Sequence, residues 1–219
     1  MGIAQGLGNA GLTPGIYTSS TRPASPADGL VISETDTDSL KVYKGTQWAP
    51  VSGLTLISAT AMTTGSVSVN NCFTSAYDNY RLLFSPSAVA ANGAIYLRLR
   101  LSGTDSSANY TTSRLYGYGG TAASQANVDG TEEMLLGYVK SAVPQVTAIS
   151  VDIFSPAQAR STVAFSSAGM METATVTDGF VLVVYNAHTP ATAYDGFTLL
   201  SSSGSNVTGT IYLYGYAKE

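Results

Sequence analysis

The sequence is short of charge and nearly devoid of cysteine. Of its 219 residues only 11% are charged, with 10 Lys and Arg against 14 Asp and Glu, and Cys72 is the one cysteine. A single cysteine excludes an intramolecular disulfide framework and every site built from several cysteines. The acidic balance offers no basic footprint for nucleic acid, and no run of Lys or Arg indicates a membrane surface. We therefore expect neither nucleic acid, nor membrane, nor cofactor as a partner.

Long hydrophobic runs are also absent. The longest purely apolar run, residues 180–185, is far too short to span a bilayer. The first fifteen residues, MGIAQGLGNAGLTPG, lack a charged segment followed by a continuous apolar one, so the sequence predicts no signal peptide. We expect synthesis in a reducing cytoplasm, with a fold held together by β-pairing and association.

What the sequence does contain is alternation. Residues 94–101 place Ile95, Leu97, Leu99 and Leu101 on one face, and Tyr96, Arg98 and Arg100 on the other. A period of two predicts a strand with one core face. Further strands are expected at residues 54–61, 80–85, 114–118, 149–153, 162–165, 197–201 and 210–216. Residues 131–139 are ambiguous between a helical turn and a strand.

Eight to ten strands separated by Gly, Asn, Ser and Pro loops predict an all-β sandwich or barrel. An antiparallel jelly roll of two sheets fits best. An immunoglobulin-like sandwich is the alternative, although the cysteine pair is missing and the strands are too many. The predicted organisation is an extended anchoring arm (1–16), a small β-hairpin module (17–52) and a jelly-roll head (53–219). The arm carries isolated apolar residues that we expect to dock on a partner, namely Ile3, Leu7 and Leu12.

The small module carries an ordered string of turn and strand signals. It reads R-P-x-S-P-x-x-G from Arg22, E-T-D-T-D from Glu34 and Y-x-G-x-x-W from Tyr43. Short β-branched and aromatic runs between Pro, Asp-Gly and Lys-Gly clusters predict two small hairpins. A unit of this size buries too little apolar surface to stand alone, so it needs neighbours.

This string resembles the connector module of tailed-phage structural proteins, above all tail-fibre and minor virion proteins in which a trimeric head follows it. The resemblance covers residues 18–51. It implies a homotrimer on the outer surface of a virion, made in the host cytoplasm and in contact with capsid or tail proteins. A capsid decoration or cement protein that clamps capsid subunits is favoured by the short arm. The alternative is a tail fibre or receptor-binding tip that attaches to the host surface, with a glycan as a possible ligand.

Residues 180–185 are apolar on both faces, so the face turned away from the core must also be covered. Either a loop folds across it or a second subunit does. Together with the tyrosines near the C-terminus this favours a threefold oligomer. The candidate interface residues are Trp48, Val181, Val183, Tyr185, Tyr212 and Tyr214.

Catalysis is not expected. His188 is the only histidine, and a Ser-His-Asp triad would have to recruit it with Asp178 or Asp195. No G-x-S-x-G elbow occurs, and a histidine in a polar loop before Thr-Pro is expected in solvent. The adjacent Glu132 and Glu133 are expected to point to opposite sides, whereas a glycosidase pair faces one sugar from both sides.

Two binding hypotheses stay open beside the structural one. Three alternating carboxylates could converge on a cation, although a solvated turn is favoured: Glu34, Asp36 and Asp38. Four tyrosines in or beside polar loops could stack on sugars, although packing is favoured: Tyr110, Tyr116, Tyr118 and Tyr194. A free carbohydrate-binding module or a glycan-cleaving enzyme is therefore the third function considered.

Overall fold

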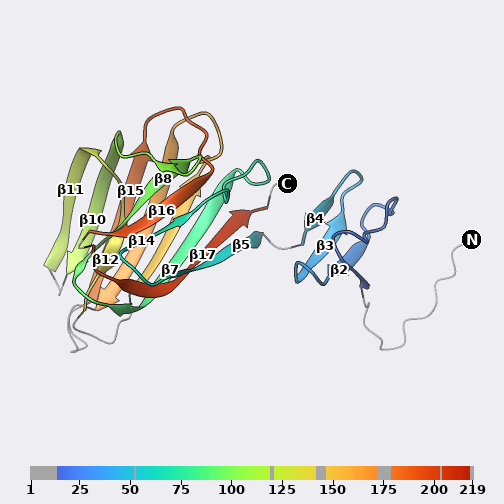
Figure 1. The fold of residues 1–219 in the computed structure, drawn as a ribbon, viewed down its shortest axis with the longest axis horizontal. Coiled ribbons are helices and arrows are strands. Elements are labelled where there is room, and N and C mark those ends of the chain that lie inside the picture. Colours follow the sequence, from blue (N-terminus) through green and yellow to red (C-terminus); the bar gives the residue numbers. More distant parts are fainter. Residues whose placement is uncertain are drawn as a thin grey trace, which may run out of the picture. The chain divides into compact units, whose positions relative to one another are not determined.

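The computed structural model describes residues 14–51, 53–118, 121–141, 147–171, 179–202 and 204–217. The chain forms two compact units, Met1–Thr55 and Leu56–Glu219, whose elements are labelled in Figure 1. No described residue is helical, and accordingly no helix among them is long and apolar enough to cross a membrane.

The first unit is one four-stranded sheet with the order β1 (Gly15–Tyr17), β2 (Val31–Glu34), β3 (Ser39–Tyr43) and β4 (Trp48–Pro50). The pairs β2–β3 and β3–β4 are antiparallel. The two expected hairpins are therefore present, and they share β3. Strand β1 pairs in parallel with β2, which the sequence analysis missed because it assigned residues 15 and 16 to the arm.

A buried ion pair holds this first unit together. Glu34 is fully buried, and its carboxylate accepts hydrogen bonds from Arg22 Nε, from Arg22 Nη2 at 2.9 Å and from Thr37 Oγ1 at 2.7 Å. The forked guanidinium matches the carboxylate geometry and lowers the pKa of Glu34. Two pieces of the string, the Arg-Pro entry and the acidic turn, are thus joined by one ion pair.

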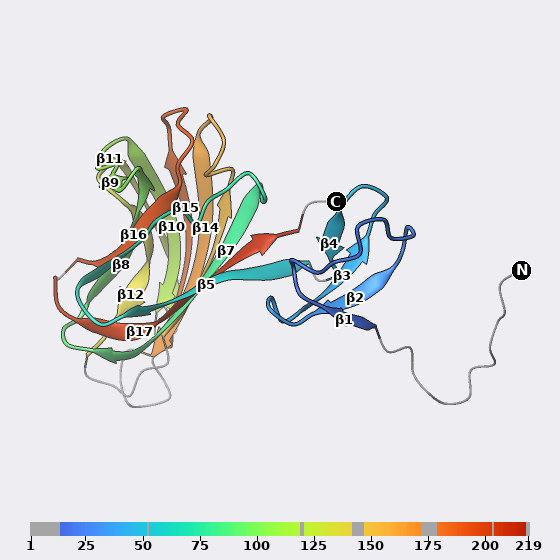
Figure 2. The ribbon, with the colours of Figure 1, turned by 45° about the vertical axis from the view of Figure 1, so that its right-hand side comes forward.

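The second unit consists of two sheets. The larger has the order β11 (Thr121–Thr131), β10 (Tyr110–Tyr118), β15 (Gly179–His188), β14 (Thr162–Met171), β13 (Ala148–Phe154), β7 (Asn79–Val89), β17 (Val207–Tyr216) and β5 (Leu54–Met62). The smaller has the order β12 (Met134–Val139), β8 (Gly93–Leu101), β16 (Gly196–Ser201) and β6 (Ser66–Val69), with β9 (Thr104–Asp105) paired to β8. Figures 1 and 2 show the two layers. The all-β sandwich is confirmed, and the jelly-roll connectivity stays a prediction.

The core lies between the two sheets, and the residues that the alternation in β8 predicts for the core lie there, with one exception. Ile95, Leu97 and Leu99 of β8 are fully buried, while Arg98 and Arg100 of the same strand make ion pairs on the other side. Leu101 is the exception, since it is 43% exposed where the chain turns back into β9. The larger sheet contributes the facing layer, which includes Tyr80, Leu82, Phe84, Val151, Ile153, Leu182, Val184, Ile211 and Leu213.

The ambiguous stretch 131–139 contains a strand, β12, at the edge of the smaller sheet. Its free backbone groups are satisfied by side chains of the larger sheet instead of by another strand. Asn186 Nδ2 donates to the Leu135 carbonyl at 2.9 Å, and Asn186 Oδ1 accepts from Leu135 N at 3.1 Å. Gly137 lets β12 approach closely, because a Cβ there would lie 2.9 Å from side-chain atoms of Ala168 and Ile149.

Candidate functional site

The strongest candidate for a functional surface is the outer face of the larger sheet, the side turned away from the smaller one. Strand pairing arranges its residues in rows that cross the sheet. One row runs through Leu115, Val183, Ser167, Ser150, Leu83 and Tyr212. The next runs through Ser113, Tyr185, Phe165, Asp152, Arg81 and Tyr214. Because neighbours in a row lie on adjacent strands, their side chains touch across the sheet.

Large apolar side chains gather on one half of this face. We call them the apolar ridge: Leu115, Phe154, Phe165, Val181, Val183 and Tyr185. Their exposed fractions range from 38% for Phe154 and Tyr185 to 58% for Val181. The ring of Phe165 makes edge contacts with Tyr185 at 5.4 Å and with Phe154 at 6.1 Å between centroids. A contiguous apolar patch of this kind on an outer surface is typical of an interaction site.

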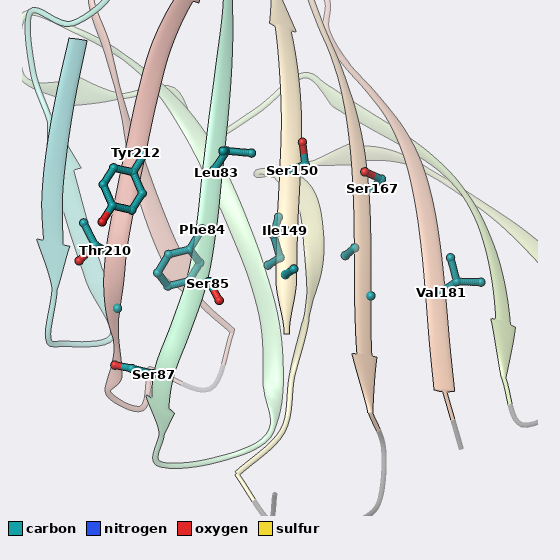
Figure 3. Close-up of a pocket in the computed structure, with 14 residues that line it drawn as sticks. Leu83, Phe84, Ser85, Ser87, Ile149, Ser150, Ser167, Val181, Thr210 and Tyr212 are labelled. Atoms are coloured by element: carbon teal, nitrogen blue, oxygen red, sulfur yellow. The ribbon is translucent and has the colours of Figure 1, made fainter. Parts of the chain in front are cut away.

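A groove of about 810 Å³ runs beside the ridge. Small residues of β13 and β14 form its floor, among them Ser150, Ser167 and Gly169. Val181 of β15 and Tyr212 of β17 lie at its two sides, as Figure 3 shows. The outer face therefore has both a projecting and a hollow half, which suits it to packing against another protein surface.

Polar groups border the apolar half. Arg81 lies 3.9 Å from Asp152 and donates from Nη2 to Ser150 Oγ at 2.9 Å. Tyr216 donates its hydroxyl to Asp152 at 2.6 Å. A polar margin around an apolar centre is the usual composition of a protein–protein interface.

The structure places five of the six candidate interface residues on this face, namely Val181, Val183, Tyr185, Tyr212 and Tyr214. The sixth, Trp48, belongs to the first unit, where its ring packs against Tyr43 at 5.4 Å. Sequence reasoning missed Leu115, Phe154 and Phe165. They come from three different strands, β10, β13 and β14, so only the pairing of strands reveals the patch.

The prediction that His188 lies in solvent is wrong, and the burial of Tyr110 and Tyr194 fits the favoured packing role and not the stacking of a sugar on their rings. His188 is fully buried, and the two tyrosines are 1% and 6% exposed. The imidazole stacks on Tyr110 at 4.1 Å, and its Nε2 lies 2.6 Å from Tyr194 Oη and 3.2 Å from Ser106 Oγ. Burial lowers the pKa of His188. Among the described residues its Nδ1 has no hydrogen-bond partner, so no carboxylate orients it as a triad requires.

The expectation that Glu132 and Glu133 point apart is also wrong. Both carboxylates contact Arg98 Nη2, at 3.1 and 2.7 Å respectively. They converge because both residues precede β12 and lie in a bend, where the alternation of a strand does not apply.

Two carboxylates of the acidic turn accept hydrogen bonds from other groups of the protein. Glu34 is paired with Arg22. Asp36 accepts hydrogen bonds from the Ser19 hydroxyl and from Ser19 N, the latter at 2.9 Å, and these bonds lower the pKa of Asp36. Asp38 adopts a left-handed conformation with φ of 47°. Within the described ranges no three His, Cys, Asp or Glu residues cluster as a metal site would require.

Several candidate residues lie outside the part of the chain that can be described. They are the arm residues Ile3, Leu7 and Leu12, the possible triad partner Asp178, and the side chain of Tyr118. No protein-family model, curated protein or solved structure matches the chain. The functional argument therefore rests on the surface just described and on the resemblance of residues 18–51.

Proposed function

We propose that this protein is a structural component of the outer surface of a tailed-phage virion, and that it assembles as a trimer through the outer face of its larger sheet. The observation that carries the proposal is the apolar ridge. Six large side chains between 38% and 58% exposed stand together on one sheet face. A second protein surface that covered them would remove apolar area from water, at about 25 cal/mol per Å².

A further copy of the same chain is the partner that requires the fewest assumptions. Residues 54–219 expose both a ridge and a groove on one face, so copies can present complementary surfaces to one another. The number three comes from the resemblance of residues 18–51 to modules that precede trimeric heads.

Capsid decoration is the placement we favour. Its low charge leaves surfaces rich in Ser, Thr, Gly and Tyr that suit packing against a shell. The second candidate is a tail fibre or receptor-binding tip, which is favoured by the kind of phage protein that the module resembles. In either placement we propose a binding role and no catalytic one.

Counting copies distinguishes these placements. Purified virions that carry the chain are digested, and its peptides are quantified by mass spectrometry against those of the major capsid protein. An abundance comparable with that of the capsid protein supports decoration. A few copies per particle, in a multiple of three, supports a tail location. Absence from purified particles refutes the virion role altogether.

A further inference from the structure

A second hollow lies at one end of the sandwich, where both sheets contribute. It has a volume of about 530 Å³, within the range of roughly 300–1,000 Å³ that is usual for small-molecule sites. Its lining comes from the inner side of the larger sheet, from β12 and from the start of β8. We call it the aromatic cleft. It is separate from the apolar ridge, which lies on the opposite face of the larger sheet.

Four aromatic rings line the cleft. Tyr116 of β10 stacks against Phe180 of β15 at 6.0 Å between centroids, and Tyr138 of β12 meets the edge of Phe180 at 5.8 Å. Tyr96 of β8 completes the set, and burial raises its pKa. Ring faces offer apolar contact and tyrosine hydroxyls offer hydrogen bonds. This combination fits a ligand that has both C–H faces and hydroxyl groups, as a sugar ring does.

The described lining of the cleft also carries two cationic residues within an acidic protein. The chain has a net charge of -4 and only ten Lys and Arg residues, yet Arg114 and Lys140 both line the cleft, and none of the described residues that line it is acidic. Arg114 donates from Nη1 to Tyr138 Oη, and its guanidinium carbon lies 5.9 Å from the centre of the Tyr116 ring. The arginine is therefore held in place by two of the ring residues.

The guanidinium has hydrogen-bonding capacity left over. Arg114 Nε is buried and has no hydrogen-bond partner among the described residues. Arginine carries five N–H donors in a rigid fork whose geometry matches a carboxylate. An arginine that lines the cleft and is held by two ring residues sets a positive charge among aromatic rings, which fits a ligand that carries a carboxylate.

We propose that the aromatic cleft binds an acidic sugar, a hexose-sized ring that bears a carboxylate. The ring packs on Tyr116, Phe180 and Tyr138, and the carboxylate pairs with Arg114. Lys140 at the margin adds favourable charge. This inference goes beyond the virion role and does not depend on it, since the site lies within one copy of the sandwich.

The test compares two sugars that differ at one carbon. Methyl glucuronide and methyl glucoside share the ring and differ by a carboxylate in place of a hydroxymethyl group, and each is titrated into the full chain by isothermal titration calorimetry. A hydrogen-bonded pair involving charge contributes about 1.5–3 kcal/mol. We therefore expect the glucuronide to bind about tenfold or more tightly than the glucoside. Propionate, a carboxylate without a ring, should bind more weakly than the glucuronide.

Variants assign the binding to the cleft. Arg114→Gln should abolish the preference for the glucuronide, and Tyr116→Ala should weaken both sugars. The matched control is Arg160→Gln, which removes an exposed arginine from the turn that follows β13 and should leave binding unchanged. If Arg114→Gln fails to fold, Tyr138→Phe keeps the ring, loses the hydroxyl that holds Arg114, and should reduce the preference.

Four results would overturn the proposal. They are no binding of the glucuronide at millimolar concentration, equal binding of both sugars, propionate binding as tight as that of the glucuronide, and an Arg160→Gln effect as large as that of Arg114→Gln. A glucuronide-terminated oligosaccharide that binds more tightly than the monosaccharide supports a glycan as the source, and equal affinity supports a free sugar acid. Sedimentation of the same samples reports the oligomer separately, so failure of sugar binding leaves the virion proposal intact.

Discussion

The hydrogen-bond network that joins the two sheets at β12 should be a main determinant of stability. Asn186 is fully buried and makes three hydrogen bonds, two with the Leu135 backbone and one from Thr112 Oγ1 at 2.8 Å. Asn186→Leu keeps the side-chain size and removes all three. It leaves the Leu135 N–H and C=O buried and unpaired, at about 1–3 kcal/mol each. We expect the free energy of unfolding of the sandwich to fall by about 3–5 kcal/mol.

Two further variants grade this effect. Thr112→Val removes one hydrogen bond while the Leu135 groups stay paired, so it should cost about 1 kcal/mol. Asn70→Ala is the control, since Asn70 is exposed and its side chain accepts a hydrogen bond from Arg100 Nε. This variant should change stability by less than about 0.5 kcal/mol. Urea unfolding is followed by far-ultraviolet circular dichroism at one fixed protein concentration, because association shifts apparent stability. If Asn186→Leu destabilises the protein no more than Asn70→Ala does, the reasoning is refuted.

Three other outcomes are expected. Val183→Asp should lower the sedimenting mass to that of a monomer, because it places a charge in the apolar ridge. Thr104→Asp, on the smaller sheet, should leave the mass unchanged. An unchanged mass for Val183→Asp would exclude this face as the interface. The free energy of unfolding should decrease as the pH falls below about 6.5, the ordinary pKa of histidine. Burial lowers the pKa of His188 in the folded state, so the unfolded chain takes up the proton at a higher pH than the folded one. This loss of unfolding free energy is at most about 1.4 kcal/mol per pH unit and should be absent from the His188→Gln variant. A variant with the same pH profile as the original protein would contradict the role of His188. Gly137→Ala should cost about 1–3 kcal/mol by forcing β12 away from Ala168, and unchanged urea stability would show that the sheets can separate freely.

The regular strands were predictable from the sequence because each turns one side to the core. In β8 the alternation of Ile95, Leu97 and Leu99 with arginines maps directly onto buried and exposed faces. Strand β12 was ambiguous because its short apolar run includes Gly137 and is covered on both sides. Its strand form depends on pairing with β8 and on the side chain of Asn186, which lies fifty-one residues from Leu135 along the chain.

The sites were only partly predictable. Val181 and Val183 stand in a run that is apolar on both faces, so the sequence alone indicates that their outer side needs a cover. Phe165 becomes part of the ridge only because β14 pairs with β15. His188 and Tyr194 lie in polar-looking segments, and their burial follows from the way the end of the sandwich closes, which no local pattern records.

The first unit shows the same division between local and long-range information. Its hairpins follow from turn residues and short β-branched runs, which are local signals. Strand β1 was missed because Gly15, Ile16 and Tyr17 have no alternation of their own, and their pairing with β2 depends on a segment further along the chain. The pairing of Arg22 with Glu34 likewise needs the fold to bring both ends of the module together.

Sedimentation equilibrium of the full chain tests the central claim, that copies of this protein cover one another's apolar ridge. One chain has a mass of 22.6 kDa. The account predicts a species of three times that mass, which dissociates when Val183 is replaced by Asp. A chain that sediments at 22.6 kDa at every concentration, with the ridge in water, would contradict it.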